Sequence, residues 1–150
     1  MKRIRVLVVD DSVTVRQLLV DALSVDPEVH VVGTAPNGAL GMTLLPKLLP
    51  DVVVLDIDMP VMDGLEFLKR VRPAWPKLPI LVFSTYTTHG AATTLQALWF
   101  GASDYIAKPT AMDFESAVVQ ARKELLPRIK AFAHADDARV VTASAPSNTV

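Results

Sequence analysis

Five short apolar runs rich in β-branched residues alternate along this chain with segments of helical periodicity. The runs cover residues 4–9, 28–34, 52–55, 79–83 and 104–107. Parallel strands joined by helices form an α/β domain with a sheet that helices cover on both faces, so such strands are apolar throughout. A hydrophobic share of 51% over 150 residues suits one domain of this kind. The sequence therefore predicts a single α/β domain with a five-stranded parallel sheet.

Helix signals fill the segments between the runs. Ser12, Asn37 and Asp113 are suited to cap helices, because their side chains accept a hydrogen bond from a free backbone N–H. Two other positions interrupt the helical pattern. Pro46 and Pro127 each predict a bend or a stop, since a proline inside a helix costs about 3 kcal/mol.

The end of the chain differs from the rest in composition. Its last residues are small and polar and have too little apolar surface to form a core. We expect one domain over residues 1–126, the end of the last helix or a linker helix over 127–139, and a disordered linker over 140–150. That linker is expected to lead to an output domain that this chain lacks.

Composition argues against several classes of function. The 15 basic and 16 acidic residues give a net charge of -1, which is not the basic footprint of a nucleic-acid-binding protein. No apolar run approaches the roughly 18 residues of a membrane span. Cysteine is absent, as is common in the reducing cytoplasm. We expect a cytoplasmic monomer that binds neither nucleic acid nor a membrane.

Polar residues stand where four of the predicted strands end. They are Asp10, Asp11, Asp56, Ser84 and Lys108. In an open parallel sheet the carboxyl ends of the strands form one edge, where ligands bind. Three carboxylates at one place repel each other unless a cation lies among them, and oxygen ligands favour Mg²⁺ or Mn²⁺. We expect Asp11 and Asp56 to bind the metal and Asp10 to hold one of its water molecules.

This residue set also predicts a reaction. A carboxylate beside a divalent ion can attack phosphorus and become an aspartyl phosphate, and Asp56 is the predicted nucleophile. Phosphoryl transfer depends mainly on charge stabilisation, which the Ser84 hydroxyl and the Lys108 ammonium would provide. The bond between Lys108 and Pro109 is a candidate for a cis peptide, because such bonds concentrate at proline in tight turns.

As an ordered set, these residues resemble the response-regulator receiver domain over about residues 4–126. The matching motifs are Asp10-Asp11-Ser12, Asp56 with Met59-Pro60-Val61-Met62-Asp63-Gly64, Ser84, Gly101-Ala102 and Lys108-Pro109. The resemblance implies a flavodoxin-like fold with strand order 2-1-3-4-5 and phosphorylation of Asp56 by a histidine kinase. It also implies that the Asp58 backbone carbonyl binds the metal, and that Ser84 and Tyr105 act as a switch.

Further residues resemble one branch of this family, the receiver that precedes the esterase domain in chemotaxis protein-glutamate methylesterases. They are Ser84-Thr85, Thr88, Gly90-Ala91, Thr94, Ala97-Leu98 and residues 104–109. The resemblance implies a methylesterase output domain. The Gly-Ala-Ser-Thr-Gly-Gly stretch with the esterase serine is missing from this chain. We therefore expect slow phosphorylation and dephosphorylation of the chain itself, without ester hydrolysis.

Two other functions remain open at this stage. Asp56-Ile57-Asp58 resembles the paired aspartates of haloacid-dehalogenase-type phosphatases, in which the second aspartate is a general acid. The chain could also be a docking module that works without phosphorylation. Trp99 has two interpretations as well, and packing against the core is favoured over a hydrophobic contact with a partner.

Overall fold

The computed structural model describes residues 2–85, 90–110 and 112–144. Its centre is a five-stranded parallel sheet with the order β2-β1-β3-β4-β5. The strands are β1 (Ile4–Val9), β2 (Val29–Ala35), β3 (Val52–Leu55), β4 (Ile80–Ser84) and β5 (Asp104–Ala107). The predicted flavodoxin-like fold class and strand order are confirmed.

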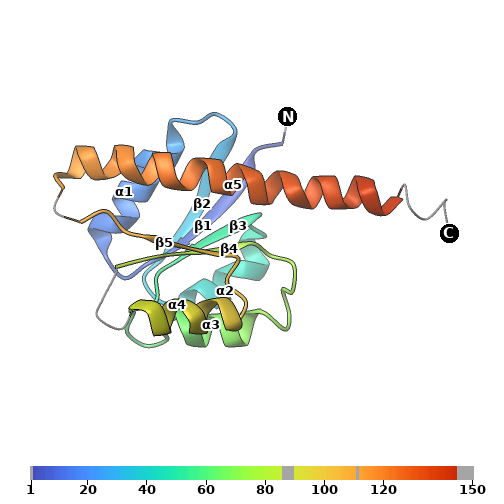
Figure 1. Cartoon of the computed structure of the whole chain (residues 1–150), viewed down its shortest axis with the longest axis horizontal. Helices are drawn as coiled ribbons and strands as arrows, with labels where there is room; N and C mark the ends of the chain where they lie inside the picture. The colour runs from blue at the N-terminus through green and yellow to red at the C-terminus, as the bar shows by residue number, and fades with distance from the viewer. Residues whose placement is uncertain (1, 86–89, 111, 145–150) are drawn as a thin grey trace.

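Helices cover both faces of this sheet (Figure 1). They are α1 (Val13–Ser24), α2 (Gly38–Leu48), α3 (Gly64–Val71), α4 (Gly90–Trp99) and α5 (Phe114–Ser144). α1 and α5 pack together on one face, and α2, α3 and α4 lie on the other.

The strand side chains divide between two hydrophobic cores. In β1, Val6 and Val8 belong to the core under α1 and α5, whereas Leu7 and Val9 belong to the core under α2 and α3. This alternation follows from the two-residue period of a strand. All four side chains have no exposed surface. The strand is therefore held from both sides, and its carboxyl end has a fixed position.

Side-chain caps start the helices where the sequence predicts them. Ser12 Oγ accepts a hydrogen bond from Val15 N, and Asn37 Oδ1 accepts one from Leu40 N. Asp113 Oδ1 accepts a hydrogen bond of 2.8 Å from Ser116 N at the start of α5. Each cap satisfies an N–H that has no partner within its own helix.

The two prolines inside helices differ in their effect on the helix. α2 ends two residues after Pro46, as expected, but α5 continues through Pro127 without a stop. Leu125 and Ile129, on either side of Pro127, are fully buried, and this packing holds the helix together. Pro127 has no N–H to donate to the carbonyl of Lys123, four residues earlier. Arg128 Nη1 donates a hydrogen bond to the next carbonyl, Glu124 O.

α5 extends further than the sequence pattern indicates. The helix is assigned as far as Ser144, past residue 140 where the linker is expected to begin, and the rest of that segment lies outside the described residues, so the linker stays a prediction. Packing in the first half of the helix propagates helical structure that local composition does not predict. Among the described residues, no helix is both long enough and apolar enough to cross a bilayer.

The residue that ends α2 provides a stability test. Leu49 has a left-handed backbone with φ of 49° and is 60% exposed, whereas Val25, which ends α1, has φ of -71° and is 58% exposed. Leu49→Gly should raise the free energy of unfolding by about 1 kcal/mol, because glycine adopts a positive φ without steric cost.

Urea unfolding measures this free energy, with Val25→Gly as the matched control. The control should lower stability by about 0.5–1 kcal/mol, since glycine there only adds freedom to the unfolded chain. Loss of stability in both variants would contradict the assigned backbone at Leu49.

Candidate functional site

Strand pairing brings the predicted site residues to one edge of the sheet. Val9 of β1 pairs with Leu55 of β3, so the next residues, Asp10 and Asp56, are neighbours. On the other side of β3, β4 ends at Ser84. The register of β4 and β5 continues past the strands, because Lys108 N donates a hydrogen bond of 2.9 Å to Ser84 O.

Asp10 is buried and has polar contacts on both carboxylate oxygens. Its Oδ1 accepts a hydrogen bond of 2.9 Å from Ser12 N, and its Oδ2 lies 2.8 Å from Lys108 Nζ. The backbone oxygen of Asp10 accepts a further hydrogen bond of 2.7 Å from Arg16 Nη1. The role of Arg16 was not predicted, and its only sequence signal is a cation one helical turn into α1.

Asp56 lies at the centre of the group and is 4% exposed. Its Oδ1 accepts hydrogen bonds from Ile57 N at 2.8 Å and from Ser84 Oγ at 2.9 Å. Its Oδ2 lies 3.3 Å from Lys108 Nζ. Burial raises the pKa of Asp56 above its ordinary value, and although Lys108 opposes this shift, the nearby Asp10 carboxylate adds to it.

A close backbone approach supports the loop that follows Asp56. A Cβ atom at Gly64 would lie 2.3 Å from Asp56 O and 2.8 Å from Ile57 Cα. Gly64 N also donates a hydrogen bond of 2.8 Å to Ile57 O. Glycine is therefore required where α3 begins, because any side chain would push this helix away from the backbone of Asp56.

The carboxylates form a group that can hold a divalent metal ion. Asp10, Asp11 and Asp56 each offer one oxygen, and these three atoms lie within 4.8 Å of one another. Asp11 is exposed, which leaves the group open to solvent on one side. The Lys108 ammonium contacts two of these carboxylates, those of Asp10 and Asp56, and its single charge is less than that of the three carboxylates. A divalent cation therefore fits the remaining charge as well as the all-oxygen ligand set. Asp58 lies in the loop after Asp56 with an exposed side chain, and its carbonyl stays a predicted ligand.

Residues around this edge complete the predicted set. Tyr105 on β5 is half-buried and packs against the core under α2 and α3. Trp99 at the end of α4 is 83% exposed, so the expectation that it packs into the core is wrong. The stripe of α4 that contacts the sheet is centred on Ala97, which is fully buried, and Trp99 points away from it. Thr88 lies outside the described residues.

The peptide bond before Pro109 also differs from expectation. None of the peptide bonds in the described ranges is cis, so the bond between Lys108 and Pro109 is trans. The trans form remains favoured by about 0.5–1 kcal/mol unless the surrounding structure selects the other isomer.

Comparison with known proteins agrees with this geometry. The family model of the response regulator receiver domain matches residues 6–120. A protein-glutamate methylesterase/protein-glutamine glutaminase from Trichodesmium erythraeum is 43% identical over 150 residues, and one from a Nocardioides species is 50% identical over 131 residues. These matches cover 99% and 87% of this chain but only 43% and 36% of those proteins. The chain thus spans less than half the length of these relatives.

A solved structure of a response regulator domain is also similar to this chain. The response regulator domain of Thermotoga maritima CheB is similar with a TM-score of 0.78 and 38% sequence identity. The match covers 89% of this chain and 98% of that one. On its sequence, its strand order and the residues at its sheet edge, this chain belongs to the response regulator receiver domain family and is similar to the CheB receivers within it.

Proposed function

We propose that this chain is the phosphoacceptor of a chemotaxis response regulator and that a histidine kinase transfers a phosphoryl group to Asp56. The observation that carries the proposal is the pair of contacts on the Asp56 carboxylate. Ser84 Oγ lies 2.9 Å from one oxygen and Lys108 Nζ lies 3.3 Å from the other. A neutral donor and a cation are thus already in place, one on each oxygen of the carboxylate that would bond to phosphorus.

The proposed transfer needs no proton from the chain. A carboxylate oxygen of Asp56 forms a bond to phosphorus as the bond from phosphorus to the donor histidine nitrogen breaks, and the electron pair of that bond stays on the imidazole. The product is an aspartyl phosphate. Lys108 and Ser84 donate to phosphoryl oxygens, and because they lie in a mostly buried site, their interactions are stronger than they would be in water.

Asp11, Asp56 and the Asp58 carbonyl would hold Mg²⁺, with Asp10 acting through a water molecule. When bound, Mg²⁺ or Mn²⁺ would neutralise carboxylate charge and stabilise negative charge on the phosphoryl oxygens. The chain's own contribution is to hold the carboxylates together. Asp10 is kept in place by Ser12 N and Lys108, and Asp56 by Ile57 N and Ser84.

Phosphorylation would change which groups Ser84 and Lys108 contact. A phosphoryl group adds charge and strong acceptor oxygens, so both side chains gain partners that the free carboxylate does not offer. Ser84 is the last residue of β4, and Lys108 directly follows β5. A shift at these two ends would reach Tyr105 and α4, the elements we propose to act as the switch.

The full-length relatives suggest what the switch controls. Their names describe methylesterase and glutaminase activities, and this chain corresponds to less than half of each. We therefore include in the proposal a methylesterase output domain and a cytoplasmic location, where kinase and output would meet. Within this arrangement the receiver itself would remain a monomer.

Metal binding should stabilise the folded chain. Mg²⁺ at about 100 times its Kd should raise the free energy of unfolding by about 2.7 kcal/mol relative to chelator. Asp11→Asn should reduce this gain to about 1 kcal/mol or less, because it removes a direct ligand. Glu115→Gln, an exposed change on α5, is the control and should keep the full gain. An equal gain in all three proteins would contradict the proposed ligand set.

Phosphorylation can be tested with acetyl phosphate and excess Mg²⁺. Intact-mass spectrometry should show one phosphoryl group on the chain and none on Asp56→Asn. Asp58→Asn, which keeps its backbone carbonyl, is the matched control and should still be phosphorylated. Sustained release of phosphate from a generic phosphomonoester would instead support the phosphatase alternative and overturn the proposal.

Lys108 should connect phosphorylation to the structural response. We expect Lys108→Ala to remain folded and to accept a phosphoryl group slowly, but without the amide shifts that phosphorylation causes in β4, β5 and α4. NMR spectra before and after acetyl phosphate measure these shifts. Lys123→Ala, on the exposed side of α5, should respond like the unchanged chain. A normal response in Lys108→Ala would show that the switch does not depend on this ammonium.

A further inference from the structure

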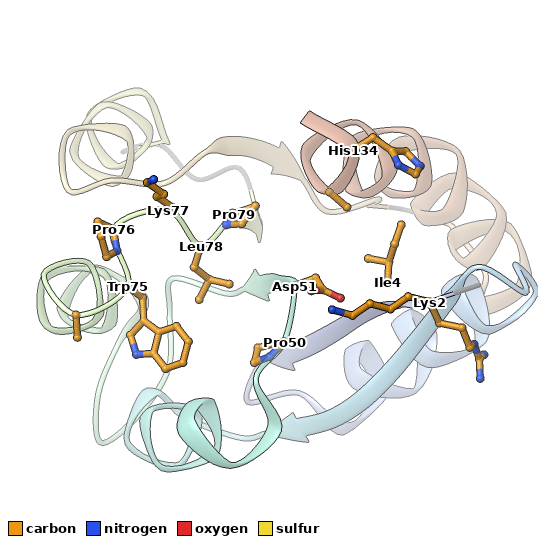
Figure 2. Close-up of a pocket in the computed structure, with 13 residues that line it drawn as sticks. Lys2, Ile4, Pro50, Asp51, Trp75, Pro76, Lys77, Leu78, Pro79 and His134 are labelled. Atoms are coloured by element: carbon orange, nitrogen blue, oxygen red, sulfur yellow. The ribbon is translucent and has the colours of Figure 1, made fainter. Parts of the chain in front are cut away.

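A cavity of about 420 Å³ lies at the opposite edge of the sheet from the carboxylate site. Its walls come from the start of β1, residues 50–51 before β3, residues 74–79 before β4, and residues 133–134 of α5 (Figure 2). The same strands end at Asp10, Asp56 and Ser84. Because the six residues of β1 span about 20 Å, this cavity is separate from the proposed phosphorylation site. Its volume is within the range of small-molecule sites, about 300–1,000 Å³.

The floor of this cavity is apolar and rigid. Ile4 and Leu78 line it and are each 8% exposed, so their positions are fixed by the cores. Pro50 and Pro79 add two rings with no backbone N–H, and Trp75 adds its indole to the lining (Figure 2). A wall of rings and branched side chains suits a flat, apolar ligand body.

The charged groups around the cavity are mainly cationic. Lys2, Arg3 and Lys77 line it, and no ion pair joins any of them to a carboxylate in the part of the chain that the structure describes. Asp51 is the single carboxylate in the lining, and its Oδ2 accepts a hydrogen bond of 2.8 Å from Arg5 N. The lining therefore has three basic side chains against one carboxylate, which leaves an excess of positive charge at the cavity.

A neighbouring cavity adds to this potential. It has a volume of about 300 Å³ and shares the segment 76–79 with the first cavity. Arg72 lines it and donates hydrogen bonds to the carbonyl oxygens of Trp75, Leu78 and Gly101. These partners are neutral, so the guanidinium charge also remains without a carboxylate among the described residues.

We propose that the larger cavity binds a small organic anion with a flat, apolar body, such as an aromatic carboxylate or sulfonate. The ring system would lie against Trp75, Leu78 and Pro79, and the anionic group would lie in the positive potential of Lys2, Arg3 and Lys77. An inorganic anion would leave the apolar floor uncovered, and a neutral ring would leave the cations unpaired. The site lies apart from Asp56, and binding there does not require phosphorylation.

Naphthalene-2-sulfonate is the probe for this proposal, titrated into the full chain and followed by amide NMR. Shifts should concentrate at residues 2–4, 51, 74–78 and 133–134. Lys2→Gln and Lys77→Gln should each weaken binding about fivefold. Asp51→Asn should strengthen binding about threefold, because it removes the single carboxylate of the lining, and the new amide oxygen can still accept the hydrogen bond from Arg5 N. Lys47→Gln, an exposed lysine outside the cavity, is the matched control and should leave affinity unchanged.

The same titration contains the results that would overturn the proposal. Equal affinity for uncharged naphthalene-2-methanol would remove the role of the cations. Shifts centred on Leu95 and Trp99, both exposed on α4, would show nonspecific binding to another apolar surface. Wild-type affinity in a variant with both Lys2→Gln and Lys77→Gln would have the same consequence. Affinity that falls as salt is added, with unchanged shifts in Asp56→Asn, is the expected outcome.

Discussion

Among the residues that the structure describes, Lys108 supplies the one ammonium group that contacts both buried carboxylates at the edge of the sheet. Its Nζ lies 2.8 Å from Asp10 Oδ2 and 3.3 Å from Asp56 Oδ2. Without it, these like charges, whose oxygens lie within 4.8 Å of each other, would repel by about 3 kcal/mol or more at an effective dielectric constant of about 20. The strands that carry these carboxylates are buried on both faces and cannot move apart. The site therefore depends on a cation, and β5 supplies one.

This constraint links the fold to the chemistry. Residues of the same sheet edge hold Asp56, neutralise part of its charge and lie where a phosphoryl group would form. Since the carboxylates outnumber the ammonium, the edge can also hold a divalent ion. In the proposed function, a phosphoryl group on Asp56 would bind Ser84 and Lys108, and their strands lead to Tyr105 and α4. The cationic cavity lies at the other end of these strands, so the two edges have opposite charge preferences.

Local patterns in the sequence were sufficient for much of this structure. The strands, the helix caps and the convergence of Asp10, Asp56, Ser84 and Lys108 follow from residue period, capping chemistry and the geometry of a parallel sheet. Long-range packing decided the features in which the structure differs from the sequence-based predictions. Burial on both sides of Pro127 kept α5 continuous, and the small stripe around Ala97 left Trp99 exposed. The cationic cavity joins four separate segments, and no local pattern indicates such a meeting.

A crystal structure of the chain with Mg²⁺ and beryllofluoride, a mimic of the phosphoryl group, would show how Ser84 and Lys108 respond to a group on Asp56. We expect beryllium bonded to an Asp56 oxygen, with Ser84 Oγ and Lys108 Nζ within hydrogen-bond distance of its fluorides and Mg²⁺ beside Asp11. Beryllofluoride on a different carboxylate, or Lys108 turned into solvent while Asp56 is occupied, would contradict this expectation.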